Sequence, residues 1–200
     1  MENKISFKAG NMLYPLPAVM VSVSDGQGQD NVFTVAWAGT VCTNPPMLSI
    51  SVRPSRFSYG LLEKTGEFVI NLTTEALAEA ADFCGVRSGR DIDKFSYLGL
   101  TKEKAELVCA PMIAESPVSI ECKVRQWIPL GSHTLLLSDV LMVHVKKEYL
   151  DETGKFWLNR SGLMVYSHGE YFSLGKSLGK FGFSVKKRSK KRKKNNKNKK

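Results

Sequence analysis

Two short segments of the chain gather polar groups where a β-strand is expected to end. The first, residues 51–59 (SVRPSRFSY), contains two arginines and three serines at the expected entry to a helix. Guanidinium groups and helix N-termini both favour a phosphate dianion. The segment is therefore a candidate phosphate site. The alternative from the residues alone is a solvent-facing loop in which Ser55 only caps the helix.

The second segment, residues 31–43 (NVFTVAWAGTVCT), combines a tryptophan with several small residues. Small residues let a flat ring approach the main chain, and Trp37 could form one wall of such a site. The alternative is that Trp37 is a core aromatic residue. For Cys42 we favour a buried, inert thiol over a redox-active one, because cysteine reactivity requires an electropositive and accessible setting.

The elements that must position these segments are mostly strands. They are expected over residues 15–24, 32–42, 47–52, 67–72, 117–127 and 135–145. The first two form a hairpin about the Gly- and Asp-rich stretch 25–30. Apolar and polar residues alternate over 117–127, which predicts one solvent-facing side. The stretch 135–145 is apolar on both faces and should run through the middle of the sheet.

Short helices are expected between the strands. They cover residues 55–64 and 74–85, with one more within 86–100, and Ser55 and Thr74 are the expected N-caps. Antiparallel strands interrupted by single helices, without regular βαβ alternation, favour a mainly β fold. We therefore expect a closed or nearly closed antiparallel barrel with a few surface helices.

The charge of the chain is concentrated at its end. Of the 29 Lys and Arg residues in the 200-residue chain, which has a net charge of +10, eleven lie within residues 186–200. Residues 1–185, expected to form one domain, therefore carry a net charge near zero. The tail 186–200 is expected to be disordered, because it has no apolar residue to bury. It could bind RNA, DNA or anionic lipid, although a purely solubilising role is the reading that we favour.

Several function classes lack their signatures in this sequence. The four cysteines and three histidines form no close ligand pair, so no metal site is expected. There is no G-x-S-x-G motif of a hydrolase. The glycines at 175, 179 and 182 lack the βαβ context of a dinucleotide-binding fold. The first eleven residues are polar and no apolar run is long enough to span a membrane, so a cytoplasmic protein with reduced thiols is expected.

Several ordered motifs together resemble one known family. They are TVAWAGTVCTNPPMLSISVRP (34–54), EFVINL (67–72), CGVRSGRDIDKF (84–95), SPVSIEC (116–122), GSHT (131–134) and HGEYFSLG (168–175). In this order they are similar to the flavin reductase-like, flavoredoxin-type family over residues 10 to 185. The resemblance implies a Greek-key split β-barrel that binds FMN non-covalently near a homodimer interface. It also implies electrons from NADH, NADPH or a protein donor.

The resemblance also assigns residues to the flavin site. The residues that line the flavin ring would be Asn31, Thr34, Ala36, Trp37, Ala38 and Gly39. Those that hold the ribityl chain and phosphate would be Ser51, Arg53, Ser58 and Tyr59. Lys94 and His133 match polar positions that close the site and could stabilise the anionic reduced flavin. Leu163, Met164 and His168 match only approximately, because spacing in that region varies within the family.

For the lysine and histidine positions, the residues alone also allow roles that involve no ligand. Lys94 could pair with Asp91 or Asp93 on a surface helix. His133 could cap a hairpin, and His144, inside an apolar strand, is expected to be a core or edge residue.

The function that the resemblance implies is an FMN-binding oxidoreductase. It would accept hydride or electrons at FMN and pass them to free flavin, ferric iron or a redox protein. No catalytic side-chain acid or base is expected, because the flavin carries the chemistry. The alternatives are a non-enzymatic flavoredoxin-type electron carrier and a nucleic-acid-binding protein that acts through its basic tail.

Overall fold

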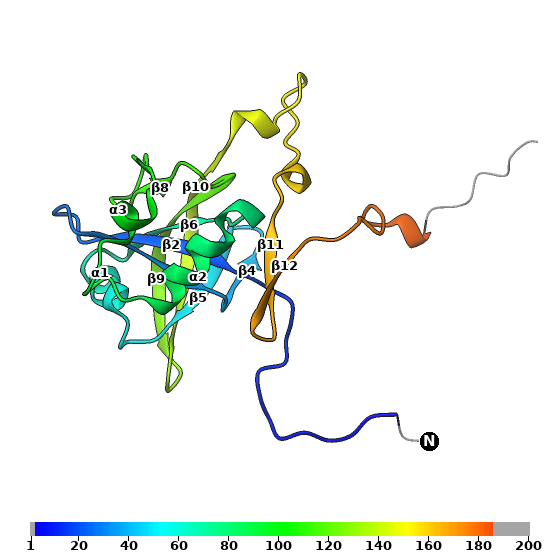
Figure 1. Cartoon of the computed structure of the whole chain (residues 1–200), viewed down its shortest axis with the longest axis horizontal. Helices are drawn as coiled ribbons and strands as arrows, with labels where there is room; N and C mark the ends of the chain where they lie inside the picture. The colour runs from blue at the N-terminus through cyan, green and yellow to red at the C-terminus, as the bar shows by residue number, and fades with distance from the viewer. Residues whose placement is uncertain (1–2, 186–200) are drawn as a thin grey trace, which may run out of the picture.

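The main sheet of the molecule has seven strands, all paired antiparallel, in the order β3-β2-β6-β9-β10-β5-β4 (Figure 1). The computed structural model describes residues 3–185, so the expected basic tail lies outside the described residues. The strands are β2 (Val19–Ser24), β3 (Asp30–Val35), β4 (Ala38–Cys42), β5 (Met47–Val52), β6 (Glu67–Asn71), β9 (Val118–Pro129) and β10 (Thr134–Val145). The expected mainly β, antiparallel fold is confirmed.

Smaller elements surround this sheet. The helices are α1 (Phe57–Thr65), α2 (Ala78–Val86) and α3 (Lys94–Leu98), with 3₁₀ turns at Glu75–Leu77, Lys147–Tyr149, Leu158–Arg160 and Phe183–Val185. A three-stranded sheet joins β1 (Leu16–Pro17), β11 (Met164–Ser167) and β12 (Glu170–Ser173), and a two-stranded one joins β7 (Lys102–Glu103) and β8 (Met112–Ile113). Within residues 3–185, none of the helices has the length and apolar character needed to cross a membrane.

The connection between β3 and β4 requires the main sheet to curl. These strands form opposite edges of the sheet, yet only Ala36 and Trp37 separate them in the chain. Seven strands side by side in a flat sheet would place the edges about 29 Å apart. Three Cα–Cα steps span at most about 11 Å. The two edges must therefore approach each other at this corner. The Ser51 N–H of β5 donates to the Trp37 carbonyl at 2.9 Å, which continues the β4–β5 pairing into the corner.

This closure overturns one prediction. Residues 32–42 were expected to form a single strand, but they form the end of β3, a corner at Ala36–Trp37, and β4. β3 pairs with β2, whereas β4 pairs with β5. Both halves have strand-like composition, so nothing local in the sequence distinguishes a corner from a continuous strand. The result is the split barrel that the family resemblance implied.

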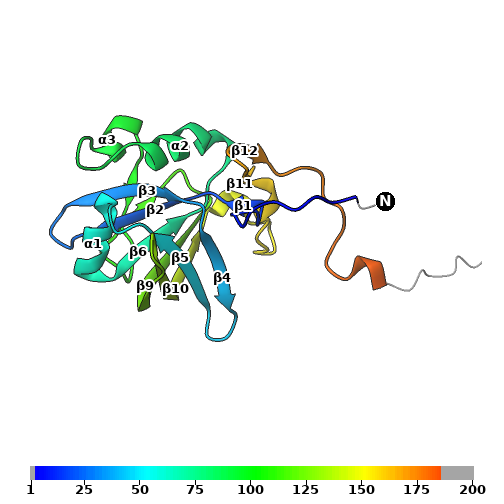
Figure 2. The same ribbon diagram turned by 90° about the horizontal axis from the view of Figure 1, so that it is seen from below.

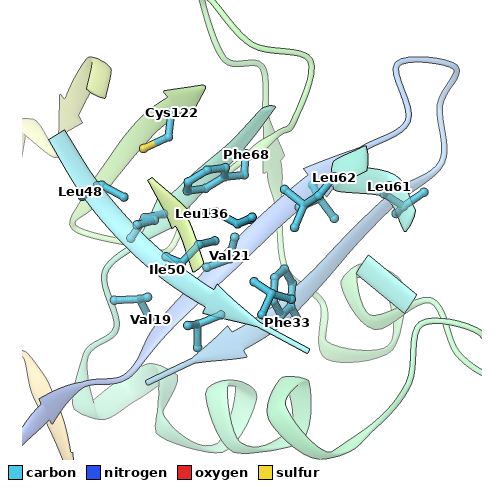
Figure 3. Packing of buried hydrophobic residues seen from close by; sticks show 14 residues of the cluster. Val19, Val21, Phe33, Leu48, Ile50, Leu61, Leu62, Phe68, Cys122 and Leu136 are labelled. Atoms are coloured by element: carbon cyan, nitrogen blue, oxygen red, sulfur yellow. The ribbon is translucent and has the colours of Figure 1, made fainter. Parts of the chain in front are cut away.

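The barrel encloses an apolar core. Val19, Val21 and Val23 of β2 belong to it with Ile50 of β5 and Leu136 of β10. Figure 3 shows Val19, Val21, Ile50 and Leu136 converging between the strands. Every one of these five side chains is almost fully buried. The alternation along β2 agrees with the period of two that a strand with one face on a core must have.

The opposite face of β2 and β3 is also covered. Met20 and Val32 pack there against Ala81 and Cys84 of α2 and Phe95 of α3. Figure 2 shows both helices lying along this side of the β2–β3 hairpin. The strand β3 is thus held between the barrel core and α2, which fixes its position for the site described below.

The predicted N-cap at Ser55 is one residue too early, whereas Thr74 lies at the predicted N-cap position. Helix α1 begins at Phe57 with Arg56 as its N-cap, because a turn in which the Arg56 N–H bonds to the Arg53 carbonyl delays the helix by one residue beyond Ser55. Thr74 precedes a 3₁₀ turn and makes no capping hydrogen bond with its side chain; its backbone instead bridges to Leu163.

The predicted solvent-facing side of β9 is wrong at Ser119 and Glu121, which are both buried. The segment 104–113 folds across the outer face of β6 and β9, where Ala105, Val108 and Met112 pack on Val69. The central position predicted for β10 is confirmed, because it lies between β9 and β5. Its second half is nevertheless exposed at residues 141–143.

Candidate functional site

A cavity of about 300 Å³ lies where the barrel closes. We call it cavity A. The corner residues Ala36 and Trp37 form one part of its lining, and Phe33 and Thr34 of β3 continue it. Helix α2 contributes a further wall with Asp82, Gly85 and Val86, and the C-terminal hairpin contributes Tyr166 and Tyr171. The lining is therefore rich in aromatic side chains.

A second cavity of about 280 Å³, cavity B, lies beside the start of α1. Its lining includes Ser55 and Ser58 from the α1 entry, and the loop 87–90 that follows α2. Phe33, Arg53 and Arg56 line both cavities. Cavities A and B therefore adjoin one another, and the first is rich in aromatic residues whereas the second is rich in cationic ones.

Lys94 is the buried cation of cavity B. Its side chain is 2% exposed, and its ammonium donates to the carbonyls of Val32 at 2.8 Å and Cys84 at 2.9 Å. Burial lowers the pKa of Lys94, and the nearby Arg56 lowers it further. An ammonium has three N–H donors, so one remains for a ligand in the cavity.

The alternative in which Lys94 pairs with an aspartate on a surface helix is wrong. Asp93 instead caps α3 by accepting the backbone N–H groups of Phe95 at 3.0 Å and Ser96 at 3.3 Å. Lys94 and Phe95, the first two residues of the helix, are both buried.

The loop 87–90 approaches α1 very closely at Gly89. A Cβ atom on Gly89 would lie 2.6 Å from Cγ of Asn31 and 2.7 Å from Cδ1 of Phe57, so glycine is required there. Asn31 is itself fixed, since its Nδ2 donates to the Ser58 hydroxyl at 2.7 Å. This contact places the loop against the α1 entry.

The lining of cavity B is strongly cationic. It contains five basic residues and no acidic one: Arg53, Arg56, Arg87, Arg90 and Lys94. The four arginines are exposed, and none of them takes part in an ion pair within residues 3–185. A site with this balance is suited to an anionic group that brings more than one negative charge.

Two polar side chains from different elements line cavity A. The Tyr171 hydroxyl donates to Asp82 at 3.1 Å, which ties the C-terminal hairpin to α2. Burial and the Asp82 carboxylate raise the pKa of Tyr171 to about 12. His133 lines the cavity from the β9–β10 turn, and burial, with the Arg53 charge, lowers its pKa. His133 is therefore mostly neutral at pH 7.

The structure brings most of the sequence-predicted residues together. Those that line cavity A are Thr34, Ala36, Trp37, Ser51, Arg53 and His133, and those that line cavity B are Asn31, Arg53, Ser58 and Lys94. Ala38 and Gly39 line a third, open hollow of about 670 Å³, which shares Trp37 and Ser51 with cavity A and is completed by residues 10–14 and Leu16. Lys94 and His133 thus occupy different ends of the site.

Other predicted residues lie elsewhere. Tyr59 packs edge-to-face on Trp127 at 5.6 Å between ring centroids, with its hydroxyl 3.1 Å from that of Thr134, and lines neither cavity. Met164 is buried in the core beneath α2, and Leu163 and His168 are outside both linings. Cys42 is half-buried and also outside them.

Sequence reasoning missed several residues of the site. Arg87, Ser88 and Arg90 line cavity B, and Asp82, Tyr166 and Tyr171 line cavity A. The signal for the loop was present, since VRSGRD lies inside a motif that carried the family resemblance. The tyrosines follow β3 by more than 130 residues, and no local pattern connects them to it.

Comparison with known proteins places the chain in a family. The family model described as "Flavin reductase like domain" matches residues 11–175. The chain belongs to the flavin reductase-like family. The flavoredoxin of Desulfovibrio vulgaris (Miyazaki F) is 31% identical, with a TM-score of 0.84 over 92% of this chain and 100% of that one.

Two relatives extend the comparison. An uncharacterized protein of Archaeoglobus fulgidus is 30% identical over 165 residues, which are 82% of this chain and 91% of that protein. An NADH:FMN oxidoreductase of Rhodococcus qingshengii is 25% identical over 167 residues, which are 83% of this chain and 79% of its own.

Proposed function

We propose that this flavin reductase-like chain binds FMN along cavities A and B and works as an oxidoreductase. The observation that carries the proposal is that two cavities adjoin: an aromatic one where the barrel closes, and a cationic one at the start of α1. A flavin mononucleotide has the same two-part character, with a flat ring at one end and a phosphate at the other.

The phosphate belongs in cavity B. Arg53 and Arg56 stand at the N-terminal end of α1, where the helix dipole also favours an anion. The hydroxyl of Ser58 and the remaining N–H of Lys94 add hydrogen-bond donors. Binding of a dianion would offset the cost of keeping the Lys94 ammonium buried, because an opposite charge favours the charged form.

The ring belongs in cavity A. Trp37 and Phe33 offer apolar surface, and the small residue Ala36 leaves the main chain accessible. When bound, FMN supplies the hydride and electron transfer, and the chain supplies binding, orientation and electrostatic tuning. His133 is the candidate to donate a hydrogen bond to the reduced ring, whereas the position of Lys94 favours a role at the phosphate.

The electron donor and acceptor distinguish two versions of this function. In the first, NADH or NADPH reduces FMN, and electrons pass to free flavin, ferric iron or a redox protein; the NADH:FMN oxidoreductase relative supports it. In the second, the protein is a flavoredoxin-type carrier with tightly held FMN, which the flavoredoxin similarity favours. Aerobic oxidation of NADH and NADPH with added FMN separates them, because only the first predicts turnover.

The assembly that we propose is a homodimer. Leu141, Met142 and Val143 of β10 are 37 to 50% exposed, and the segments 3–13 and 174–185 extend away from the body (Figure 1). Apolar surface of this kind is typical of an interface. Light scattering on the purified chain should give twice the chain mass of 22.3 kDa, and a monomer would contradict the proposal.

Binding of FMN and of riboflavin tests the proposed orientation. FMN should bind at least tenfold more tightly than riboflavin, since riboflavin lacks the phosphate. Arg53→Ala and Lys94→Met should remove most of that difference. Arg125→Ala is the matched control, because Arg125 pairs with Asp139 and lines neither cavity. Equal affinity of the wild type for both flavins would place the phosphate outside cavity B.

A further inference from the structure

The cations of cavity B stand on two separate walls. Arg53 and Arg56 lie at the α1 entry, near the buried Lys94, whereas Arg87 and Arg90 lie on the loop that follows α2. Three positive charges at the α1 side already exceed the two negative charges of the FMN phosphate. The two guanidiniums of the facing loop are therefore in excess of what FMN needs.

The loop that carries this excess charge is well defined. The Arg87 N–H bonds to the Phe83 carbonyl at 2.9 Å as α2 ends, and the Arg90 N–H bonds to the Ser88 hydroxyl at 3.2 Å. Gly89 lies against Asn31 and Phe57, which holds the loop on the α1 entry. The two guanidiniums consequently extend from a fixed turn at the edge of the cavity.

The loop also continues directly from the wall of cavity A. Asp82, Gly85 and Val86 of α2 line cavity A, and Arg87 is the next residue in the chain. A molecule that lies on the flavin ring in cavity A and extends along α2 would bring its distal part to Arg87 and Arg90. The electron donor of the proposed reaction is such a molecule.

We infer that Arg87 and Arg90 bind a second phosphate group beside that of FMN, and that this group is the 2′-phosphate of NADPH. The inference rests on the proposed function and makes NADPH the preferred donor over NADH. The ligand chemistry is a phosphate monoester held by paired guanidiniums, the interaction for which arginine is best suited. A diphosphate flavin such as FAD is the other source of a second phosphate, and the experiment separates the two.

The kinetic test compares kcat/KM for NADPH and NADH in the FMN-loaded protein. We expect a ratio of at least ten in favour of NADPH. Arg87→Ala and Arg90→Ala should each lower this ratio at least fivefold, which is a larger factor than that by which they raise the FMN dissociation constant. The control Arg125→Ala removes one positive charge outside both cavities and should leave the ratio unchanged.

A binding test is independent of turnover. Calorimetric titration of the FMN-loaded protein should give at least tenfold tighter binding of 2′,5′-ADP than of 5′-ADP, and Arg87→Ala should abolish that difference. FAD should bind no more tightly than FMN.

Three results would overturn the inference. One is equal affinity for 2′,5′-ADP and 5′-ADP in a protein that binds FMN. Another is a loss of FMN affinity in Arg87→Ala or Arg90→Ala with an unchanged nucleotide preference, which would assign these arginines to the FMN phosphate. The third is FAD binding that is tighter than FMN binding. Failure of the wild type to bind FMN would instead refute the proposed function, so the two failures are distinguishable.

Discussion

Replacement of Glu121 by glutamine should destabilise the fold markedly, although the site of change is far from the proposed flavin cavity. The carboxylate is fully buried. One oxygen accepts the Glu106 N–H at 2.9 Å and lies 2.6 Å from Nε2 of His144. The other accepts the N–H groups of Leu107 at 2.7 Å and Val108 at 3.0 Å. This single side chain thus holds the loop that covers β6 and β9.

The size of the destabilisation follows from the hydrogen bonds that a glutamine amide can make at position 121. The glutamine oxygen can accept from Leu107 and Val108, but its NH₂ group then faces the N–H of Glu106, which loses its partner. An unpaired buried N–H costs about 1–3 kcal/mol, and the two remaining bonds each lose about 1 kcal/mol of charge assistance. Removal of a buried charge offsets part of this loss. We expect Glu121→Gln to lower the free energy of unfolding by about 2–4 kcal/mol.

Urea denaturation followed by circular dichroism measures this change. The matched control is Glu115→Gln, because Glu115 accepts only the exposed Thr101 N–H, at 3.0 Å, and a glutamine oxygen can replace it. The control should change the unfolding free energy by less than about 1 kcal/mol. A Glu121→Gln protein as stable as the control would refute the reasoning.

The Glu121 carboxylate also makes the difference in unfolding free energy between the wild type and Glu121→Gln depend on pH. Burial alone would raise the pKa of Glu121, but the N–H groups of Glu106 and Leu107 and the His144 ring outweigh it, so the pKa lies below its ordinary value of 4.5. A lowered folded-state pKa contributes stability that is present above the unfolded pKa and is lost as the pH falls through the folded one. The stability difference between wild type and Glu121→Gln should therefore shrink below pH 4.5.

The remaining predictions concern the two cavities. Gly89→Ala should weaken FMN binding at least tenfold in a flavin fluorescence titration, because the methyl group would displace Asn31 and Phe57, which line cavity B. Gly60→Ala, whose Cβ meets nothing within 4 Å, should bind FMN normally. Tyr171→Phe removes the hydrogen bond to Asp82 and should lower the unfolding free energy by about 0.5–1.5 kcal/mol, so an unchanged melting temperature would exclude a stabilising role. His133→Ala should make the FMN midpoint potential more negative, and an unchanged potential would rule out His133 as a tuning residue.

The sequence predicted the strands and their antiparallel arrangement because apolar periodicity is a local signal. It could not reveal the corner at Ala36–Trp37, since strand propensity is high on both sides of it. That corner exists because β3 and β4 pair with different partners, which is a property of the whole sheet. The same limit applies to Glu121, where an alternating pattern predicts a solvent-facing side that a distant segment covers.

The candidate site was predictable where one strand or loop supplies neighbouring residues. Trp37, Ser51 and Arg53 belong to two chain segments that chemistry and family motifs both single out. Lys94 was assigned to the site by its motif, yet its burial depends on the cap of α3 and on its contact with β3. Tyr171 reaches the site only through the C-terminal hairpin, so no reasoning from a single segment could have placed it there.

The central claim is that cavities A and B together hold one FMN, and titration of the purified chain with FMN tests it most directly. We predict saturation at about one flavin per chain with a dissociation constant at or below the micromolar range, and an absorbance band near 450 nm that stays with the protein through gel filtration. A chain that remains colourless and leaves the fluorescence of added FMN unchanged at these concentrations would contradict the account.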